Sequence, residues 1–420
     1  MNNSKKTVVI IGAGSRGLGY AKHIKHYGEG EIVVGVVDPN LERVKKIKEI
    51  FPDITDEMIF SDWKDFVAKG KIADAVVIAT QDQMHKEPAI ACANLGYHML
   101  LEKPMAPNAE DCQAIVHAVK QSDIIFAVCH VLRYTKFFQK LHELIVGGTI
   151  GDLVTIQHFE HVGYWHMAHS FVRGKWGNES QSSFMLLAKS CHDIDILRYL
   201  IGKPCVRTQS FGSLLHFKKE NKPAEAADAT RCLDCGYESH CPYSAMKIYI
   251  RDQFDEGTRR WPLSVLVSEI TRDNILESLR VGPYGRCVYE CTNDVVDHQV
   301  VNLEYEGGIT ASFTMSGFNV GSREIIIQGT RGMIRGDMIK NKISIMDFLT
   351  DNTKEIEVAP LANDFHGGGD EGLIQAWLAA LRTGDRKLIA SGPDESLESH
   401  LTVFAAEQSR LRGTVDKIGL

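Results

Sequence analysis

The sequence lacks three features that would assign it to a simple class. No apolar run approaches the roughly 20 residues needed to cross a bilayer, so we expect no membrane span. There is no basic excess, because 47 basic and 54 acidic side chains give a net charge of −7. Such a chain has no broad electrostatic attraction for nucleic acid or an anionic membrane. We also find no internal repeat, heptad pattern or low-complexity tract.

The N-terminal residues 1–6 show no small-residue cleavage site typical of a signal peptide. We therefore expect a cytoplasmic protein whose ten cysteines are reduced thiols or metal ligands, with no disulfide framework. A length of 420 residues suits two domains. The apolar share of 44% and the charged share of 24% are ordinary for a soluble globular enzyme.

The first forty residues carry a dinucleotide-binding pattern. A β-branched run at 7–11 precedes a glycine-rich loop, a helix-like segment at 18–27 and a second strand, 31–37, that ends at Asp38. Glycines let the backbone approach a pyrophosphate, and the helix N-terminus attracts that anion. The bland interpretation is a glycine turn in any α/β protein. The predicted cofactor-binding residues of this region are Gly12, Gly14, Ser15, Arg16, Gly17 and Asp38.

The identity of the dinucleotide depends on two side chains. Asp38 can accept hydrogen bonds from ribose hydroxyls and would repel a 2′-phosphate, which favours NAD over NADP. Arg16 weakens this preference, because a guanidinium in the loop suits either cofactor. NAD is the cofactor that we predict.

Strands and helices alternate through residues 1–130, which predicts a doubly wound parallel sheet, a Rossmann domain. Further strands are expected at 73–80, 97–101 and 124–128. Ligands of such sheets lie beyond the carboxyl ends of the strands. Polar residues at these ends are His85, Lys103, His130, Arg133 and Tyr134, and the additional predicted cofactor contacts are Thr80, Gln81, His85, Glu102 and Lys103.

These residues carry a resemblance to a known family. The glycine loop, Asp38, His85 before a helix, the step Glu102-Lys103-Pro104 and a later histidine–aspartate helix resemble the Gfo/Idh/MocA oxidoreductases, over nearly the whole chain. The resemblance implies an N-terminal Rossmann domain and a C-terminal α/β domain with a large open, mostly antiparallel sheet. It also implies hydride transfer between a nicotinamide cofactor and a sugar or cyclitol carbon, and it places the family's catalytic lysine on Lys103.

Three residues are predicted to be catalytic: Lys103, His192 and Lys189. Lys103 would handle the proton of the reacting hydroxyl, and its alternative is a surface lysine after a strand. The helix pattern over 186–197 puts Lys189 and His192 three residues apart, on one face. The family pattern has an aspartate four residues before this histidine and a glycine two before it, where this chain has Ala188 and Ser190.

This departure leaves two explanations open. Lys189 either takes over part of the proton handling or binds an anionic substrate group. Alternatively it faces solvent, and Asp193 or Asp195 supports His192. A buried structural histidine is the competing interpretation of His192 itself.

Substrate contacts are predicted at Arg133, Tyr134, Trp165, Asp193 and His366. Trp165 lies in an aromatic and polar stretch that suits either a carbohydrate or a subunit interface. His366 lies in the glycine-rich segment 365–370, which either closes over substrate or acts as a plain linker.

The second domain is expected at 131–420, with strands at 295–305, 309–316 and 324–328 and a cysteine-rich insertion around 205–292. Cys232, Cys235 and Cys241 form a Cys-x-x-Cys knuckle with a third thiol. They predict either a closed structural zinc site or three free cysteines. The candidates for a fourth ligand are His240, Cys205, Cys287 and Cys291.

The leading functional prediction is an NAD-dependent oxidoreductase acting on a secondary hydroxyl of a sugar, glycoside or cyclitol. The first alternative is a glycosidase that uses NAD catalytically through oxidation, elimination, hydration and reduction. The second is a non-catalytic nucleotide-binding sensor. The predicted partner is a small carbohydrate, with no nucleic acid and no membrane, and a homodimer or homotetramer is expected by analogy.

Overall fold

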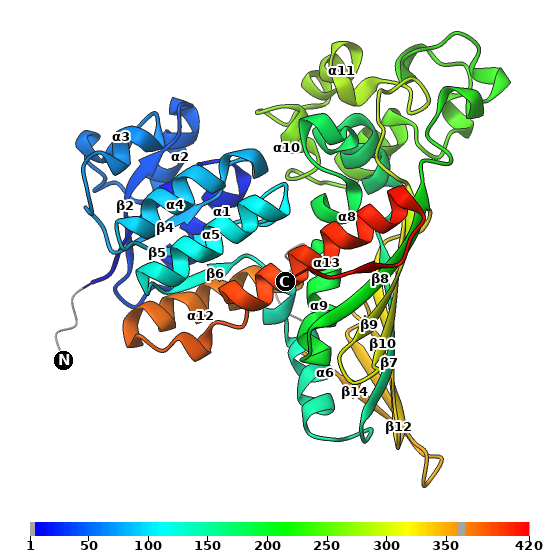
Figure 1. Ribbon diagram of the computed structural model, residues 1–420. Coiled ribbons are helices and arrows are strands. Elements are labelled where there is room, and N and C mark those ends of the chain that lie inside the picture. The colour runs from blue at the N-terminus through cyan, green and yellow to red at the C-terminus, as the bar shows by residue number, and fades with distance from the viewer. Residues whose placement is uncertain (1–4, 360–365, 420) are drawn as a thin grey trace.

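The computed structural model describes residues 5–359 and 366–419, and they form two sheets with helices around them (Figure 1). The first sheet is six-stranded and entirely parallel, in the order β3-β2-β1-β4-β5-β6. Its strands are β1 (Thr7–Ile11), β2 (Ile32–Val37), β3 (Ile59–Phe60), β4 (Ala75–Ile78), β5 (His98–Leu101) and β6 (Phe126–Val128). The unbroken apolar runs are buried because helices cover both faces of the sheet.

The helices of this domain connect successive parallel strands. They are α1 (Ser15–Tyr27), α2 (Leu41–Ile50), α3 (Trp63–Val67), α4 (Lys86–Asn94) and α5 (Ala109–Ser122). Asn40 and Asn108 accept hydrogen bonds from backbone N–H groups and so cap α2 and α5. The predicted Rossmann sheet is confirmed, including the strand switch between β1 and β4 where a ligand crevice forms.

The second sheet has nine strands in the order β14-β13-β12-β11-β7-β10-β9-β8-β15. Neighbouring strands are antiparallel except β7 and β10, which are parallel. The strands are β7 (Leu153–His161), β8 (Cys205–Ser213), β9 (His298–Tyr305), β10 (Thr310–Ser316), β11 (Ser322–Gly329), β12 (Gly332–Asp337), β13 (Lys342–Asp347), β14 (Thr353–Glu357) and β15 (Asp416–Lys417). The expected large, mostly antiparallel sheet is confirmed.

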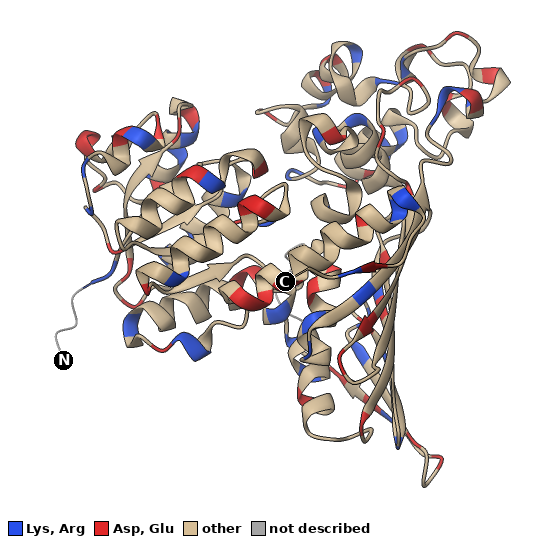
Figure 2. Cartoon of the chain, viewed as in Figure 1, with Lys and Arg blue, Asp and Glu red and all other residues tan. Residues whose placement is uncertain are grey.

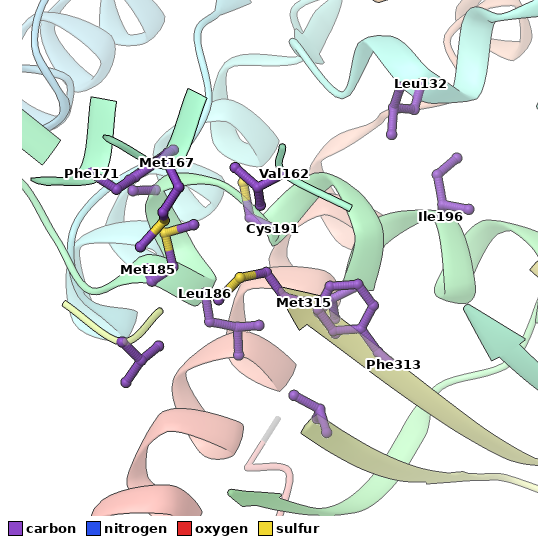
Figure 3. Packing of buried hydrophobic residues seen from close by; sticks show 14 of the residues in the cluster. Leu132, Val162, Met167, Phe171, Met185, Leu186, Cys191, Ile196, Phe313 and Met315 are labelled. Atoms are coloured by element: carbon purple, nitrogen blue, oxygen red, sulfur yellow. The ribbon is translucent and has the colours of Figure 1, made fainter. Parts of the chain in front are cut away.

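Helices cover one face of this sheet (Figure 1). They are α6 (Lys136–Val146), α8 (Met185–Ala188), α9 (Cys191–Ile201) and α13 (Pro393–Arg412). Buried positions alternate along β10, as one covered face requires. Phe313 and Met315 of β10 pack with Leu186 and Cys191 in a core that Figure 3 shows from close by. This core fixes the segment around residue 190 against the sheet.

The last helices return to the first domain. Buried side chains of α12 (Gly369–Thr383), among them Trp377, belong to the same hydrophobic cluster as β1 and α1. Helix α13 contacts α5 of the first domain as well as α9 and β8 of the second. The boundary at residue 130 stays a prediction, but the packing adds α12 to the core of the nucleotide domain.

The insertion between β8 and β9 is built largely of short turns. Its α-helices in the described chain are α10 (Leu263–Leu266) and α11 (Arg272–Val281), and a π-helix spans Met246–Phe254. The insertion packs at the end of the sheet near α8 (Figure 1). Acidic and basic residues are interspersed over both domains in the view of Figure 2. Within the described residues, no helix has the length and apolarity to cross a membrane.

Candidate active site

The glycine loop between β1 and α1 has the geometry expected of a phosphate cradle. Gly12 has a φ of +93°, and a Cβ there would lie 2.6 Å from the Ala79 carbonyl oxygen. A Cβ on Gly17 would lie 2.0 Å from the Gly12 carbonyl oxygen. No acidic residue stands in the first turn of α1, and Gly14 leaves its N-terminus without a side-chain cap. The free N–H groups and the positive end of the helix dipole therefore fit a pyrophosphate.

Asp38 stands at the end of β2, where a ribose-binding carboxylate is expected. Its Oδ2 accepts a hydrogen bond of 2.8 Å from Ala13 N, and its Oδ1 accepts one of 2.8 Å from Asn40 N. These bonds hold the carboxylate against the glycine loop. The Arg43 guanidinium lies 3.8 Å from it.

Arg16, predicted to contact the cofactor, forms ion pairs within the protein. Its guanidinium pairs with Glu102 and Asp370 and donates to the Tyr20 hydroxyl. Burial opposes ionisation of Glu102, but the Arg16 charge lowers the pKa of that carboxyl below its usual range. The ion pairs of Arg16 with Glu102 and Asp370 thus connect α1 to the end of β5 and to α12.

The residues after β4 make hydrogen bonds within the loops at the end of the sheet. The Thr80 hydroxyl donates to Met84 O at 3.2 Å, and Gln81 precedes a short 3₁₀ turn. His85 is fully buried, with Nδ1 2.9 Å from Pro104 O and Nε2 3.4 Å from Thr80 O. Its ring links the loops that follow β4 and β5, and a cofactor contact of His85 stays a prediction.

Lys103 extends from the end of β5 to the second domain. Its Nζ donates a hydrogen bond of 3.0 Å to Ala188 O. In a continuous α-helix that carbonyl would accept the N–H of residue 192. Here α8 ends at Ala188 and α9 begins at Cys191, with Ser190 in a non-helical conformation. The prediction of one helix with Lys189 and His192 on a shared face is therefore wrong, because the break frees a carbonyl for the Lys103 ammonium.

His192 is 4% exposed, and its Nδ1 has no hydrogen-bond partner within the described chain. Burial first, and then the neighbouring Lys103 charge, lower the pKa of His192 well below its ordinary value. Its imidazole is accordingly neutral near pH 7 and able to accept a proton. The ring of His366 lies 5.9 Å away, and His366 Nδ1 is 2.7 Å from Asp370 Oδ2. Lys103, His192 and His366 thus come together.

Lys189 takes part in a buried ionic network. Its Nζ lies 3.2 Å from Glu160 Oε1. Arg323 Nε lies 2.7 Å from Glu160 Oε2 and 2.8 Å from Asp193 Oδ1. Burial lowers the pKa of Lys189, and the Glu160 carboxylate opposes that shift. The interpretation that Lys189 faces solvent is therefore wrong, since its side chain is 19% exposed and paired.

Asp193 is committed to the same network. His158 Nε2 lies 2.9 Å from its Oδ1, and the residue is fully buried. Burial opposes ionisation, but the Arg323 charge and the hydrogen bond to His158 lower the pKa of Asp193. Both oxygens of Asp193 are bound by His158 and Arg323, and its predicted substrate contact stays a prediction.

Arg133 and Tyr134 likewise have structural partners where substrate contacts were predicted. Arg133 is 2% exposed and donates two hydrogen bonds of 2.7 Å to Asp195, plus one to Ala390 O at 2.5 Å. The Tyr134 hydroxyl lies 2.9 Å from Ser391 Oγ. Both side chains tie the end of β6 to the C-terminal segment. A substrate contact for either residue stays a prediction.

Trp165 lies in an aromatic cluster near Lys189. Its ring stacks on His166 at 5.6 Å and contacts Trp261, from the insertion, at 5.3 Å. Burial, followed by the Lys189 charge, lowers the pKa of His166 well below its ordinary value. The insertion therefore contributes an apolar wall beside the site, and a substrate contact for Trp165 stays a prediction.

Sequence reasoning missed Glu160, His158 and Arg323. A signal for two of them was present in the sequence. Ile156, His158 and Glu160 lie two residues apart along β7, so all three point to its buried face. Buried polar residues in a strand with one covered face point to a network or a site.

The cysteine knuckle lies in the insertion. As the side chains stand, no group of three or more His, Cys, Asp or Glu in the described parts of the chain is arranged to hold a metal ion. All ten cysteines are free thiols.

The fold and the site together define a two-domain, dinucleotide-binding oxidoreductase. Residues 6–130 match the model of an oxidoreductase family's NAD-binding Rossmann fold, and residues 142–417 match its C-terminal alpha/beta domain. The chain belongs to this family, Gfo/Idh/MocA.

Several known proteins are similar to this chain. A putative oxidoreductase YteT of Bacillus subtilis is 23% identical over 88% of both chains. A 2,7-anhydro-N-acetylneuraminate hydratase of Escherichia coli is 30% identical over 36% of this chain and 40% of its own length. A myo-inositol 2-dehydrogenase of Thermotoga maritima is 26% identical over 49% of this chain and 58% of its own. The structure of a levoglucosan dehydrogenase with NADH and levoglucosan covers 99% of this chain and 100% of its own, with 17% identity and a TM-score of 0.69.

Proposed function

We propose that this protein is an NAD-dependent dehydrogenase that oxidises a secondary hydroxyl of a sugar, glycoside or cyclitol. The observation that carries the proposal is the break between α8 and α9, where the Lys103 ammonium binds Ala188 O and lies near a neutral His192. The Nδ1 atom of His192 has no hydrogen-bond partner among the described residues. The inositol dehydrogenase relative supports the substrate class. NAD is favoured over NADP because Asp38 would repel a 2′-phosphate.

The cofactor would be held by the glycine loop, the N-terminus of α1 and Asp38. When bound, NAD supplies the hydride acceptor. His192 Nδ1 accepts the proton of the substrate hydroxyl, since lowering of its pKa keeps the ring neutral. The Lys103 ammonium stabilises the oxygen as negative charge develops on it. His366, held by Asp370, orients a neighbouring hydroxyl.

A second candidate is elimination and hydration with NAD recycled in the site, the chemistry of a glycosidase or hydratase. The hydratase relative favours it, and elimination requires a further base beside the reacting C–H. Lys189 is the candidate, because it lies beside His192 in the chain and burial lowers the pKa of its amine, while the Glu160 carboxylate opposes that shift.

The test is a panel of free sugars, cyclitols and nitrophenyl glycosides assayed with NAD in two channels, NADH and nitrophenol. NADH formation identifies a dehydrogenase. Nitrophenol release that needs NAD but accumulates no NADH identifies the recycling chemistry. NAD binding without turnover on any substrate supports a sensor and contradicts both enzymes.

Lys103→Ala and His192→Ala test the residue roles. Each is expected to retain NAD binding by calorimetry and to lose roughly 10²- to 10⁴-fold in kcat. Lys69→Ala, on an exposed loop, is the matched control and should leave kcat unchanged. Near-normal turnover in both site variants would refute the assignment.

A further inference from the structure

The cysteines of the insertion are brought together by its backbone. Cys235 N donates to Cys232 O, and Glu238 N donates to Cys235 O, so the chain turns tightly after each of the first two cysteines. An isolated β-bridge pairs Arg231 with Arg286, and Cys287 N donates to Thr230 O at 2.9 Å. The bridge thereby places Cys287, 46 positions beyond Cys241 in the chain, beside the knuckle.

Four thiol-bearing residues line one cavity: Cys232, Cys235, Cys241 and Cys287. The cavity measures about 20 Å³, somewhat more than the roughly 10–15 Å³ that one water-sized group needs. The other candidates for a fourth ligand, His240, Cys205 and Cys291, do not line this cavity. The Cys205 thiol bonds to Glu304 O in the sheet, and the Cys291 thiol bonds to Cys287 O.

Arg173 lines the same cavity, and so does Glu238, whose carboxylate is paired with Arg251. Arg173 is 5% exposed, and its Nη1 has no hydrogen-bond partner among the described residues. Its other nitrogens donate to Arg286 O and Tyr243 O at 2.7 Å and to Cys232 Sγ at 3.4 Å. No carboxylate of the described chain forms an ion pair with it. A buried guanidinium without a counter-charge is costly, so the cavity calls for negative charge.

Protonated thiols do not supply this charge. A bound thiophilic metal deprotonates its thiol ligands. Four thiolates around a divalent ion carry a net charge of about −2, which Arg173 would partly neutralise.

We propose that Cys232, Cys235, Cys241 and Cys287 bind a thiophilic metal centre as thiolates, with Arg173 as its buried counter-charge. Four S–H bonds break and four metal–sulfur bonds form, and the four protons pass to solvent, with no change of oxidation state. The thiols must turn toward the cavity on binding, because as they stand no three of them in the described chain are arranged around an ion. A single zinc ion fits this ligand chemistry, because zinc takes four thiolates in closed structural sites and the cavity has room for one ion.

Elemental analysis of the full-length protein, purified anaerobically without chelators, tests the proposal. We expect one zinc per chain. Less than about a tenth of an equivalent of zinc, in protein that also fails to take up zinc on reconstitution, would overturn the proposal, and so would iron with acid-labile sulfide in place of zinc.

Single variants test the ligand set. Cys235→Ser and Cys287→Ser are expected to lower the metal content at least tenfold, whereas Cys291→Ser, the matched control, retains it. Full metal in Cys287→Ser with loss in Cys291→Ser would overturn the assigned set. If the ligand variants do not fold, alkylation of the wild-type protein decides. The four thiols should be protected as isolated and react after chelation, and equal reactivity in both states would contradict the proposal.

Discussion

At the scale of single residues, Arg133, a predicted substrate contact, forms a buried ion pair with Asp195. Its two hydrogen bonds to Asp195 are fully buried, so Arg133→Met would leave an uncompensated carboxylate. Breaking such a pair costs about 3–5 kcal/mol, and we expect urea unfolding to report a loss of that size. KM for the substrate should be unchanged in the folded variant. Normal stability with a raised KM would return Arg133 to substrate binding.

At the scale of elements, the first turn of α1 offers a matched pair of glycines. A Cβ on Gly17 would meet the Gly12 carbonyl oxygen at 2.0 Å, whereas a Cβ on Gly19 would meet nothing within 4 Å. Gly17→Ala is therefore expected to distort the loop and weaken NAD binding at least tenfold. Gly19→Ala should keep the affinity and raise the free energy of unfolding by up to about 1 kcal/mol. Equal NAD affinities, measured by calorimetry, would contradict this account of the loop.

The same scale shows what a sequence can predict. The strands β1 and β2 and the loop and helix between them were predicted correctly because their signals are local and close in the chain. The break between α8 and α9 was missed, since it depends on Lys103, 85 residues earlier, bonding to the Ala188 carbonyl. β3, with two residues, and β14, largely exposed, gave no clear alternation to detect. Partners distant in sequence, such as Arg133 and Asp195, decide which polar residues stay free for a ligand.

At the scale of the whole molecule, buried histidines set the response to acid. Burial lowers the pKa of His130 and of His169 to about 3 each, against roughly 6.5 in an unfolded chain. Because the folded pKa lies below the unfolded one, the unfolded chain binds more protons as the pH falls below about 6.5. The contribution of these two histidines to the free energy of unfolding is therefore fully present above about pH 6.5 and is lost as the pH falls below it.

Each of these histidines contributes a slope that approaches about 1.4 kcal/mol per pH unit, so the two together give roughly 2.7 kcal/mol per pH unit between pH 6 and 4.5. Urea unfolding at pH 7.5, 6 and 5 measures the slope. His169→Gln removes one of the two titrating groups and should reduce the slope by about 1.4 kcal/mol per pH unit, which corresponds to one proton. Stability that stays constant from pH 6.5 to 4.5 would show that these rings are protonated in the folded protein, and would also remove the basis for a neutral His192, whose pKa is lowered by the same burial.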